Sequence, residues 1–377
     1  MNLMIYETTH HETLPAILDL AESYFSNTTV YLKESSYQNL CSESLPESRW
    51  LKACFVRQKP SESNRNFITT CFQEANKGDF THFHISTLDN NLLYFSLQLM
   101  FARKIKISLS VQAVNEYAAL RSATFRDFTE SIAKIYLHRR IRRYRVFSPK
   151  MADHLKQRIP HSMPVYIPPR FYGQPAHKTI RDFLKIVVPG SFDPIRRDYV
   201  QVVAFFKEFL DGGPYEKRIE LVMLGNSSNE YGKKIISDLK KAESNIFSVK
   251  YYSDYIMPAE YEFQLRDADL VWSPIQIQTK GIRNTPEIYG QSTATGLTGD
   301  LLLGTTPALL PIGFSVPEHY ENAIILYQST ADLTGWIQYF MRTRDDQRQS
   351  KIEKDFSFFC RRNFQAPFEM LFELNRP

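Results

Sequence analysis

Short apolar runs alternate with longer amphipathic segments along the first half of the chain. The runs are rich in β-branched and aromatic residues and cover residues 3–6, 29–32, 82–86, 105–111 and 144–147. Each run is too short for a buried helix, so each predicts a strand. Between the runs, apolar side chains recur every three or four positions over residues 14–25, 64–75, 92–102 and 123–137. This alternation of strands and helices predicts βαβ units and a mainly parallel sheet.

A proline-rich stretch separates the first half of the chain from the second. Five prolines and Gly173 fall within residues 160–175, where few apolar positions recur with a regular period, and this composition predicts a linker. Beyond it, strands are expected at residues 184–188, 219–224, 247–251, 270–272, 301–303 and 323–326. Helices are expected at residues 198–209, 232–242 and 330–339, before a charged and aromatic tail over residues 347–374. In the polar region of residues 33–64, one further strand is expected at residues 50–56.

The two halves predict two α/β domains of Rossmann-like type. We expect the first over residues 1–168, a linker over residues 169–180 and the second over residues 181–345. A chain of 377 residues is long enough for two domains of ordinary size. Ligands of open α/β sheets bind beyond the carboxyl ends of the strands, so the site is expected in a cleft between the domains.

Glycine is scarce and unevenly distributed. The sequence contains 14 glycines, and Gly78 alone precedes residue 173. A glycine-rich phosphate loop needs residues that adopt positive φ, so the first half is a poor place for one. A nucleotide site built on close approach of the backbone is therefore expected in the second half.

Composition and charge exclude several classes of protein. A hydrophobic fraction of 43% excludes a disordered chain. The sequence contains no apolar stretch of about 20 residues, so it predicts no membrane-spanning helix. The first residues lack the basic segment of a signal peptide. The four cysteines have no metal-binding spacing and are expected to be reduced, which favours a cytoplasmic location. A net charge of +5 does not by itself indicate nucleic-acid binding.

Two βα turns in the second half have features of a phosphate site. The first turn carries a glycine, a serine and two arginines: Gly190, Ser191, Arg196 and Arg197. Glycine and serine let the backbone approach a ligand, and arginine supplies a fixed positive charge for phosphate. An ordinary loop with solvated arginines is the alternative. In the second turn, a strand ends at Gly225 and Asn226.

The segment of residues 280–296 holds the largest set of candidate ligand groups. Lys280 and Arg283 would neutralise a diphosphate without a metal. A helix start would hold the diphosphate through the backbone N–H groups of Gly290, Gln291 and Ser292. Glu287, just before this turn, would accept hydrogen bonds from sugar hydroxyls. A surface loop followed by a capped helix is the alternative.

In their order and spacing, these segments resemble the GT-B glycosyltransferases, in particular the family-four retaining enzymes. In that family the second domain opens on a strand, a glycine and a basic residue, as Gly190 and Arg197 do here. A second strand ends in glycine, like the strand before Gly225. A loop that precedes a helix contacts the nucleotide base, and Tyr255 and Ile256 lie in a similar loop.

The same family has a motif of two glutamates, and the first glutamate aligns with Glu287, followed by Tyr289 and Gly290. The resemblance implies that Glu287 orients the donor sugar and that the reaction retains the anomeric configuration. It also implies two Rossmann-like domains that face each other across a cleft. A C-terminal helical tail, residues 346–377, would pack back on the first domain.

Three positions depart from the family. Thr295 stands where the second glutamate contacts the nucleotide ribose, and a hydroxyl cannot accept two charge-assisted bonds as a carboxylate can. Gln112 stands where the family often has a histidine. After the first strand, the family has a glycine-rich acceptor loop, whereas this chain has His10, His11 and Glu12.

His10 and His11 are candidates for contact with the acceptor, or for a general base if the reaction inverts the anomeric centre. A pair of histidines hydrogen-bonded within its own turn is the alternative. His11 and Glu12 do not continue into the HExxH zinc motif, so no metal is expected.

One run of basic residues stands out, with Arg139, Arg140, Arg142, Arg143 and Arg145. No nucleic-acid-reading module or aromatic platform accompanies it, so nucleic acid is not expected as a partner. Peripheral contact with anionic lipid at the inner membrane surface, or with a lipid-linked diphosphate, is the functional hypothesis. A solvated helix end is the alternative.

The sequence therefore predicts a metal-independent glycosyltransferase that uses a UDP- or GDP-type sugar donor and no cofactor. Its acceptor would be a saccharide or a lipid-linked molecule, in the synthesis of a surface polysaccharide or glycoconjugate. Arg197, Lys280 and Arg283 would stabilise the leaving diphosphate. Two alternatives stay open: a catalytically silent scaffold protein on the same fold, favoured by Thr295 and Gln112, and a nucleotide-sugar epimerase.

Overall fold

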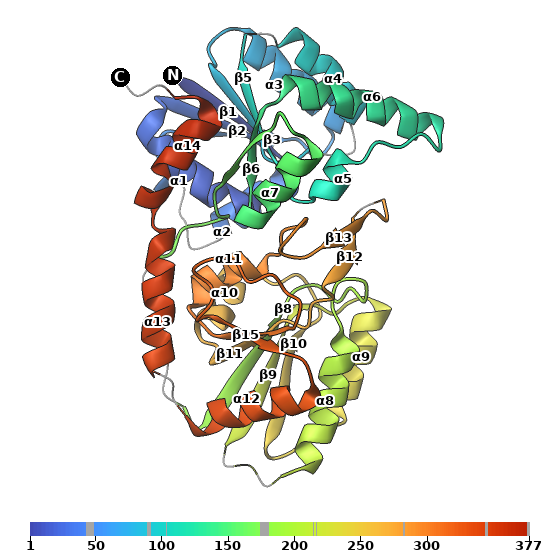
Figure 1. Cartoon of the computed structure of the whole chain (residues 1–377), viewed down its shortest axis with the longest axis vertical. Coiled ribbons are helices and arrows are strands. Elements are labelled where there is room, and N and C mark those ends of the chain that lie inside the picture. Colours follow the sequence, from blue (N-terminus) through green and yellow to red (C-terminus); the bar gives the residue numbers. More distant parts are fainter. Residues whose placement is uncertain are drawn as a thin grey trace. The chain divides into compact units, whose positions relative to one another are not determined.

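The computed structural model divides into two compact units, each of which is an α/β domain (Figure 1). Unit 1 comprises Met1–Phe171, Gly281–Ala294 and Phe359–Pro377, and unit 2 comprises Tyr172–Lys280 and Thr295–Phe358. The structure describes residues 1–42, 49–88, 92–102, 104–173, 181–213, 215, 217–281, 283–343 and 346–374. Residues 174–180, most of the expected linker, lie outside the described residues.

Seven parallel strands form the sheet of unit 1, in the order β3-β2-β1-β4-β5-β6-β7. Their bounds are β1 Asn2–Glu7, β2 Asn27–Lys33, β3 Ala53–Gln58, β4 His82–Ile85, β5 Lys106–Ser110, β6 Arg143–Val146 and β7 Met163–Tyr166. The apolar runs of the first half are confirmed as strands. β7 was not expected, because it lies in the proline-rich stretch. Its Pro164 is compatible with a strand at the edge of the sheet, where a missing N–H costs little.

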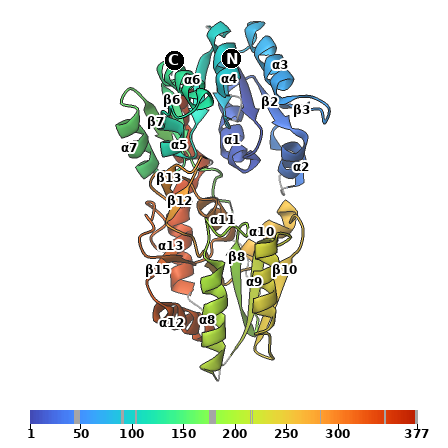
Figure 2. The same cartoon turned by 90° about the vertical axis from the view of Figure 1, so that its right-hand side faces the viewer.

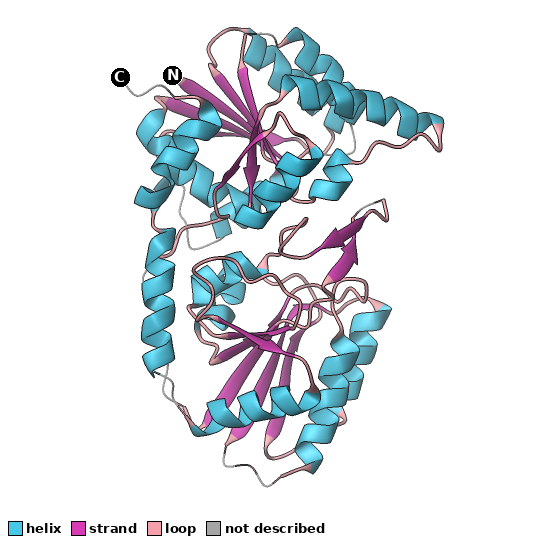
Figure 3. Ribbon diagram, viewed as in Figure 1, coloured by secondary structure: helices cyan, strands magenta, loops and turns pink. Residues whose placement is uncertain are grey.

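The helices of unit 1 are α1 Leu14–Tyr24, α2 Glu34–Ser42, α3 Asn64–Asn76, α4 Leu92–Phe101, α5 Val114–Ala118, α6 Phe125–Arg140, α7 Pro149–Arg158 and α14 Gln365–Phe372, with the 3-10 turns η1 His11–Thr13 and η4 Arg361–Phe364. They cover both faces of the sheet (Figure 3). Successive side chains of β4 show this, since they point to opposite faces. Phe83 packs against rings of α3 and α4, whereas His82 and His84 contact Phe372 of α14.

Six parallel strands form the sheet of unit 2, in the order β10-β9-β8-β11-β14-β15. Their bounds are β8 Phe183–Pro189, β9 Arg218–Asn226, β10 Phe247–Tyr252, β11 Leu270–Trp272, β14 Ala308–Pro311 and β15 Ile324–Tyr327. The short strands β12 Gln278–Lys280 and β13 Pro286–Ile288 lie outside both sheets. The helices of unit 2 are α8 Tyr199–Asp211, α9 Glu230–Lys240, α10 Pro258–Arg266, α11 Leu297–Gly304, α12 Thr330–Arg342 and α13 Asp346–Phe356. Helices α8 and α9 lie side by side (Figure 2).

Two elements of unit 2 differ from the expectation. Residues 301–303, expected as a strand, lie within α11, because a run of three leucines fits a buried helix as well as a buried strand. The strand β14 was not expected. Its apolar residues lie between Pro307 and Pro311, which hide the signal of a strand.

The C-terminal segment returns to the first domain, which confirms the expected position of the last helix. Residues from Phe359 onward belong to unit 1, and α14 packs against α1 and against the strands β5, β6 and β7. The Tyr24 hydroxyl donates a hydrogen bond of 2.9 Å to Glu369 of α14.

The segment Gly281–Ala294 belongs to unit 1, although the sequence predicted an unbroken second domain over residues 181–345. Backbone hydrogen bonds explain this placement. The Ala294 N–H donates to the Gln112 carbonyl at 2.9 Å, and the Val114 N–H donates to the Ser292 carbonyl at 2.7 Å. The segment is thereby bound to the loop that follows β5.

Candidate functional site

The carboxyl edge of the unit 2 sheet brings two glycines into close contact. Gly190, directly after β8, has a φ of +109°, a conformation that favours glycine. Gly225 lies near the end of β9, and a Cβ atom on it would lie 2.0 Å from the carbonyl oxygen of Gly190. Neither position has room for a side chain, so the two turns predicted from the sequence form one tightly packed edge.

Arg197 lies directly over this edge. A Cβ atom on Gly190 would lie 2.1 Å from the guanidinium carbon Cζ of Arg197. Within the described residues no carboxylate pairs with this guanidinium, and its buried Nε has no hydrogen-bond partner. A guanidinium that is half-buried and lacks an acidic partner is suited to binding an anion.

The other residues of this edge are more open. Arg196 is exposed, with its Nε 3.4 Å from Asp193. Ser191 and Asn226 are exposed, and the Asn226 side chain accepts a hydrogen bond of 2.8 Å from the Ser228 N–H. Tyr255 is exposed in the loop that follows β10.

The neighbouring strands β10, β9 and β8 therefore present candidate ligand residues at one edge. Arg197 comes from the turn after β8, Gly225 from the end of β9, and Tyr255 and Ile256 from the loop after β10. The carboxyl end of β11 joins them, because the Asp198 N–H donates to the Pro274 carbonyl at 2.8 Å. Such an edge of a parallel sheet is the usual place for a ligand.

The helix start expected at Gly290, Gln291 and Ser292 is wrong. These residues form tight turns, and their N–H groups donate to the carbonyls of Thr293 and Ile288 at 2.9 to 3.1 Å. The helix begins instead at Leu297, where α11 starts in unit 2. Thr295, two residues before it, accepts a hydrogen bond of 3.3 Å from the Leu297 N–H. Backbone groups that are already hydrogen-bonded cannot hold a diphosphate.

Glu287 is buried and both of its carboxylate oxygens have partners. Oε1 accepts a hydrogen bond of 2.7 Å from the Glu116 N–H of α5, and Oε2 accepts one from the Ser292 hydroxyl. Burial raises the pKa of Glu287, and the hydrogen bond from Ser292 offsets part of this effect. These contacts attach the segment Gly281–Ala294 to the start of α5. The expected contact of Glu287 with a donor sugar stays a prediction.

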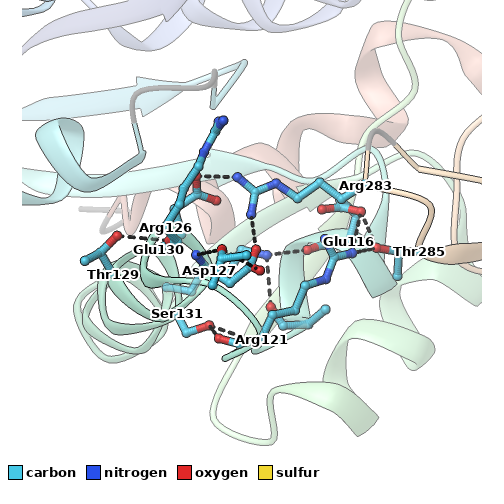
Figure 4. Close-up of polar contacts among 12 residues, drawn as sticks. Glu116, Arg121, Arg126, Asp127, Thr129, Glu130, Ser131, Arg283 and Thr285 are labelled. Carbon is cyan, nitrogen blue, oxygen red and sulfur yellow. Dashed lines mark hydrogen bonds and ion pairs between the residues drawn. The ribbon is translucent and has the colours of Figure 1, made fainter.

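Arg283 is engaged with acidic residues of α6 (Figure 4). Its guanidinium lies 3.0 Å from Asp127 and also pairs with Glu130. In the same network Thr285 and Arg121 bond to the Glu116 carboxylate. Two carboxylates already neutralise Arg283, whereas Lys280 is exposed in unit 2. Tyr289 is buried in unit 1, and Gln291 is exposed there.

At the carboxyl edge of the unit 1 sheet, His10 and His11 both lie near Glu12. Nδ1 of His10 lies 3.0 Å from the Glu12 carboxylate, and Nδ1 of His11 lies 3.7 Å from it. Burial lowers the pKa of His11, and the charge of Glu12 only partly offsets this. This contact agrees with the alternative given above, in which the two histidines are bonded within their own turn. Contact of His10 and His11 with a sugar acceptor stays a prediction. Groups of three or more His, Cys, Asp or Glu side chains suited to a metal ion do not occur in the described residues.

Glu7, the last residue of β1, is a buried carboxylate that the sequence reasoning missed. Its Oε1 accepts three hydrogen bonds of 2.6 Å, from the N–H groups of Thr9 and His10 and from the Thr87 hydroxyl. Its Oε2 is buried and has no hydrogen-bond partner among the described residues, like the side-chain N–H₂ group of Gln112. An acidic residue at the last position of an otherwise apolar strand was the available signal.

The basic run does not form one surface, and the expectation fails for Arg145. Its guanidinium is buried and donates to the carbonyls of Thr13, Ile167 and Pro168 at 2.5 to 3.2 Å. Burial lowers the pKa of Arg145 to about 9. Arg140 bonds to the Ala102 and Ile105 carbonyls, and Arg143 pairs with Glu373 at 3.0 Å. Arg139 and Arg142 are exposed.

None of the helices in the described part of the chain is long and apolar enough to cross a membrane. The chain matches no protein-family model and no curated protein.

Several solved structures are similar to the chain over nearly its whole length. Anabaena Alr3699/HepE, whose structure holds UDP and glucose, shares 14% identity, with 99% of this chain and 95% of that chain covered and a TM-score of 0.59. An α,α-trehalose-phosphate synthase (UDP-forming) from Burkholderia vietnamiensis shares 8% identity over 98% of each chain, with a TM-score of 0.57. A protein assigned as a UDP-N-acetylglucosamine 2-epimerase from Listeria monocytogenes shares 12% identity over 100% of this chain and 98% of that chain, with a TM-score of 0.55. At these identities the likeness shows the fold, and it confirms the GT-B fold class expected from the sequence.

Proposed function

We propose that the protein is a glycosyltransferase that takes a sugar from a nucleotide-diphosphate donor bound at the carboxyl edge of the unit 2 sheet. The observation that carries this proposal is the Arg197 guanidinium, which lies over Gly190 with no acidic partner among the described residues. A leaving diphosphate gains negative charge as the sugar departs, and a prepositioned guanidinium stabilises that charge. Arg197, with exposed Lys280 as a second cation, takes the place of a metal ion.

We assign the base of the donor to the loop after β10. Exposed Tyr255 and half-buried Ile256 offer an aromatic ring and an apolar contact to a nucleobase. Two of the similar proteins are described with UDP, which favours a UDP-type donor over a GDP-type donor. Retention of the anomeric configuration stays an expectation from the family.

We assign the acceptor to the carboxyl edge of the unit 1 sheet. Glu7 Oε2 and the Gln112 side-chain N–H₂ group are buried there without partners among the described residues. Such groups gain free energy when a hydroxyl-rich ligand pairs with them. His10 and His11 stand at the same strand end. A saccharide or lipid-linked acceptor fits this chemistry, and synthesis of a surface polysaccharide or glycoconjugate in the cytoplasm is the corresponding role.

Calorimetric titration with UDP, GDP and their sugars tests the donor site. We expect heat with UDP and a loss of about tenfold or more in affinity for Arg197→Ala, because a charge-assisted bond to phosphate is lost. Arg218→Ala is the matched control, since Arg218 is exposed, pairs with Asp182 and begins β9 at the opposite end of the strand, and it should bind as the wild type does. Absence of heat with every nucleotide would overturn the donor site and favour the scaffold alternative.

A nucleotide-sugar epimerase is the second candidate, and the similarity to the assigned Listeria epimerase favours it. An epimerase consumes its nucleotide sugar without an acceptor. Incubation with UDP-N-acetylglucosamine alone, followed by NMR of the sugar ring, distinguishes the two. A new sugar epimer would replace the transferase proposal.

A further inference from the structure

The outer surfaces of α4 and α6 expose a set of large apolar side chains. On α4 these are Leu93, Leu97, Met100 and Phe101, and on α6 they are Phe125, Phe128, Ile132 and Ile135. They are 38% to 83% exposed. Large exposed apolar patches are uncommon on monomeric proteins and mark interaction sites. We call these eight side chains the α4/α6 face.

The eight side chains lie on one side of unit 1. Most of them recur at intervals of three or four residues, which places them in one stripe along each helix. The two helices pack side by side, and the Ser96 hydroxyl of α4 donates to the Ala133 carbonyl of α6 at 3.5 Å. The opposite sides of both helices, with Phe95 and Leu137 among them, are buried in the same core. Both stripes therefore point away from this core.

Exposed basic residues lie at the C-terminal ends of both helices of the α4/α6 face. Helix α4 contains no charged residue, and exposed Lys104 follows it. On α6, Arg139 continues the exposed stripe four residues after Ile135, and exposed Arg142 follows the helix. These cations are placed where apolar side chains would enter a lipid layer and basic side chains would meet its head groups.

The acidic side chains of α6 are withdrawn from this face. Asp127 and Glu130 are only 17% and 15% exposed, and both pair with Arg283 from the segment Gly281–Ala294 (Figure 4). The ion pairs therefore neutralise the carboxylates that would repel an anionic surface. Among its described residues, a second copy of the chain offers Arg139 and Lys104 no acidic partner on this face, since the two carboxylates of α6 are already paired with Arg283, whereas an anionic surface complements both cations.

We propose that the α4/α6 face docks unit 1 onto an anionic lipid bilayer. The proposal concerns a surface outside both candidate substrate sites, so it does not depend on the proposed transfer activity. It replaces the contact expected from the basic run alone, of which Arg139 and Arg142 remain.

Flotation with lipid vesicles tests this proposal, using phosphatidylcholine alone and phosphatidylcholine mixed with phosphatidylglycerol. We expect the wild-type protein to float with the mixed vesicles only. The double variant Phe128→Glu, Ile132→Glu should lose at least about tenfold in vesicle partition, because both apolar contact and charge complementarity are removed. Val200→Glu, a similarly exposed apolar position on α8, is the matched control and should float as the wild type does.

A second measurement keeps the test independent of folding of the double variant. In Phe128→Trp, the added indole should shift its emission to the blue on mixed vesicles and be quenched by brominated lipid, whereas the indole of Val200→Trp should not respond. Equal partition onto both vesicle types, or an unresponsive indole at residue 128, would overturn the proposal. So would a dimer in analytical ultracentrifugation that the double variant abolishes, since a second copy would then occupy the face.

Discussion

The guanidinium of Arg197 lies so close to Gly190 that any Cβ atom at residue 190 would fall 2.1 Å from its Cζ atom. The backbone conformation of Gly190, with a φ of +109°, independently disfavours every other residue. A glycine at residue 190 is therefore needed both for the turn after β8 and for the position of the Arg197 guanidinium.

Gly190→Ala is expected to weaken UDP binding and to destabilise unit 2. The left-handed backbone costs an alanine about 1–2 kcal/mol, and the new methyl group displaces the Arg197 guanidinium. Calorimetry with UDP and urea unfolding measure the two effects. Gly335→Ala is the control, because a Cβ atom there meets no atom within 4 Å and the residue lies inside α12. That variant should be equal to the wild type or slightly more stable, and equal UDP affinity for both variants would contradict the role of the Arg197 contact.

Glu287→Ala is expected to lower the free energy of unfolding by about 1–3 kcal/mol, because the Glu116 N–H and the Ser292 hydroxyl lose their acceptor in a buried place. Burial raises the folded-state pKa of Glu287 above its ordinary 4.5. The stabilisation that comes from protonated Glu287 is therefore fully present below pH 4.5, and it is lost as the pH rises through the folded-state pKa and the buried carboxyl ionises.

Glu287→Gln, which stays neutral, should consequently gain stability relative to the wild type as the pH rises from about 4 to 7. Urea unfolding at both pH values measures this difference. A constant difference between the two proteins would show that the pKa of Glu287 is not raised by folding. Unchanged transfer activity in Glu287→Gln would separately argue against contact with the donor sugar.

Most strands and helices could be predicted because local signals determine them, whereas β7 and β14, with prolines in or beside them, and the partners of the site residues could not. Gly190 and Gly225 follow apolar runs, and a glycine at the end of a strand usually indicates that another group packs closely against the backbone there. Arg283, in contrast, is bound by Glu130, 153 residues away in the sequence. A sequence shows that a cation is present but not that a distant helix neutralises it. For the same reason the sequence assigned Glu287 to a ligand when its hydrogen bonds go to α5 and Ser292.

Arg283 and Glu130 are expected to be energetically coupled. Both side chains are mostly buried, at 24% and 15% exposure, so their interaction is screened less than an exposed pair. A double-mutant cycle with Arg283→Ala and Glu130→Ala should give a coupling free energy of about 1 kcal/mol. The exposed pair of Arg218 and Asp182 provides a comparison cycle, for which the coupling should be near zero. Equal coupling in the two cycles would mean that the network of Figure 4 does not stabilise unit 1.

His84 is expected to make the stability of unit 1 depend on acid. The ring is buried between the hydroxyls of Ser108 and Ser110, at 2.8 and 3.0 Å. Burial, assisted by the charge of Arg145, lowers its pKa to about 3 from an ordinary 6.5. The unfolded chain therefore binds a proton between these values that the folded chain does not, so stability falls as the pH drops below 6.5. The loss from this residue approaches about 1.4 kcal/mol per pH unit and levels off below the folded-state pKa. Urea unfolding between pH 7 and pH 5 should show that the free energy of unfolding depends less steeply on pH for His84→Gln than for the wild type, even if the variant is less stable at pH 7. An equally steep dependence for both proteins would mean that His84 is protonated in the folded protein.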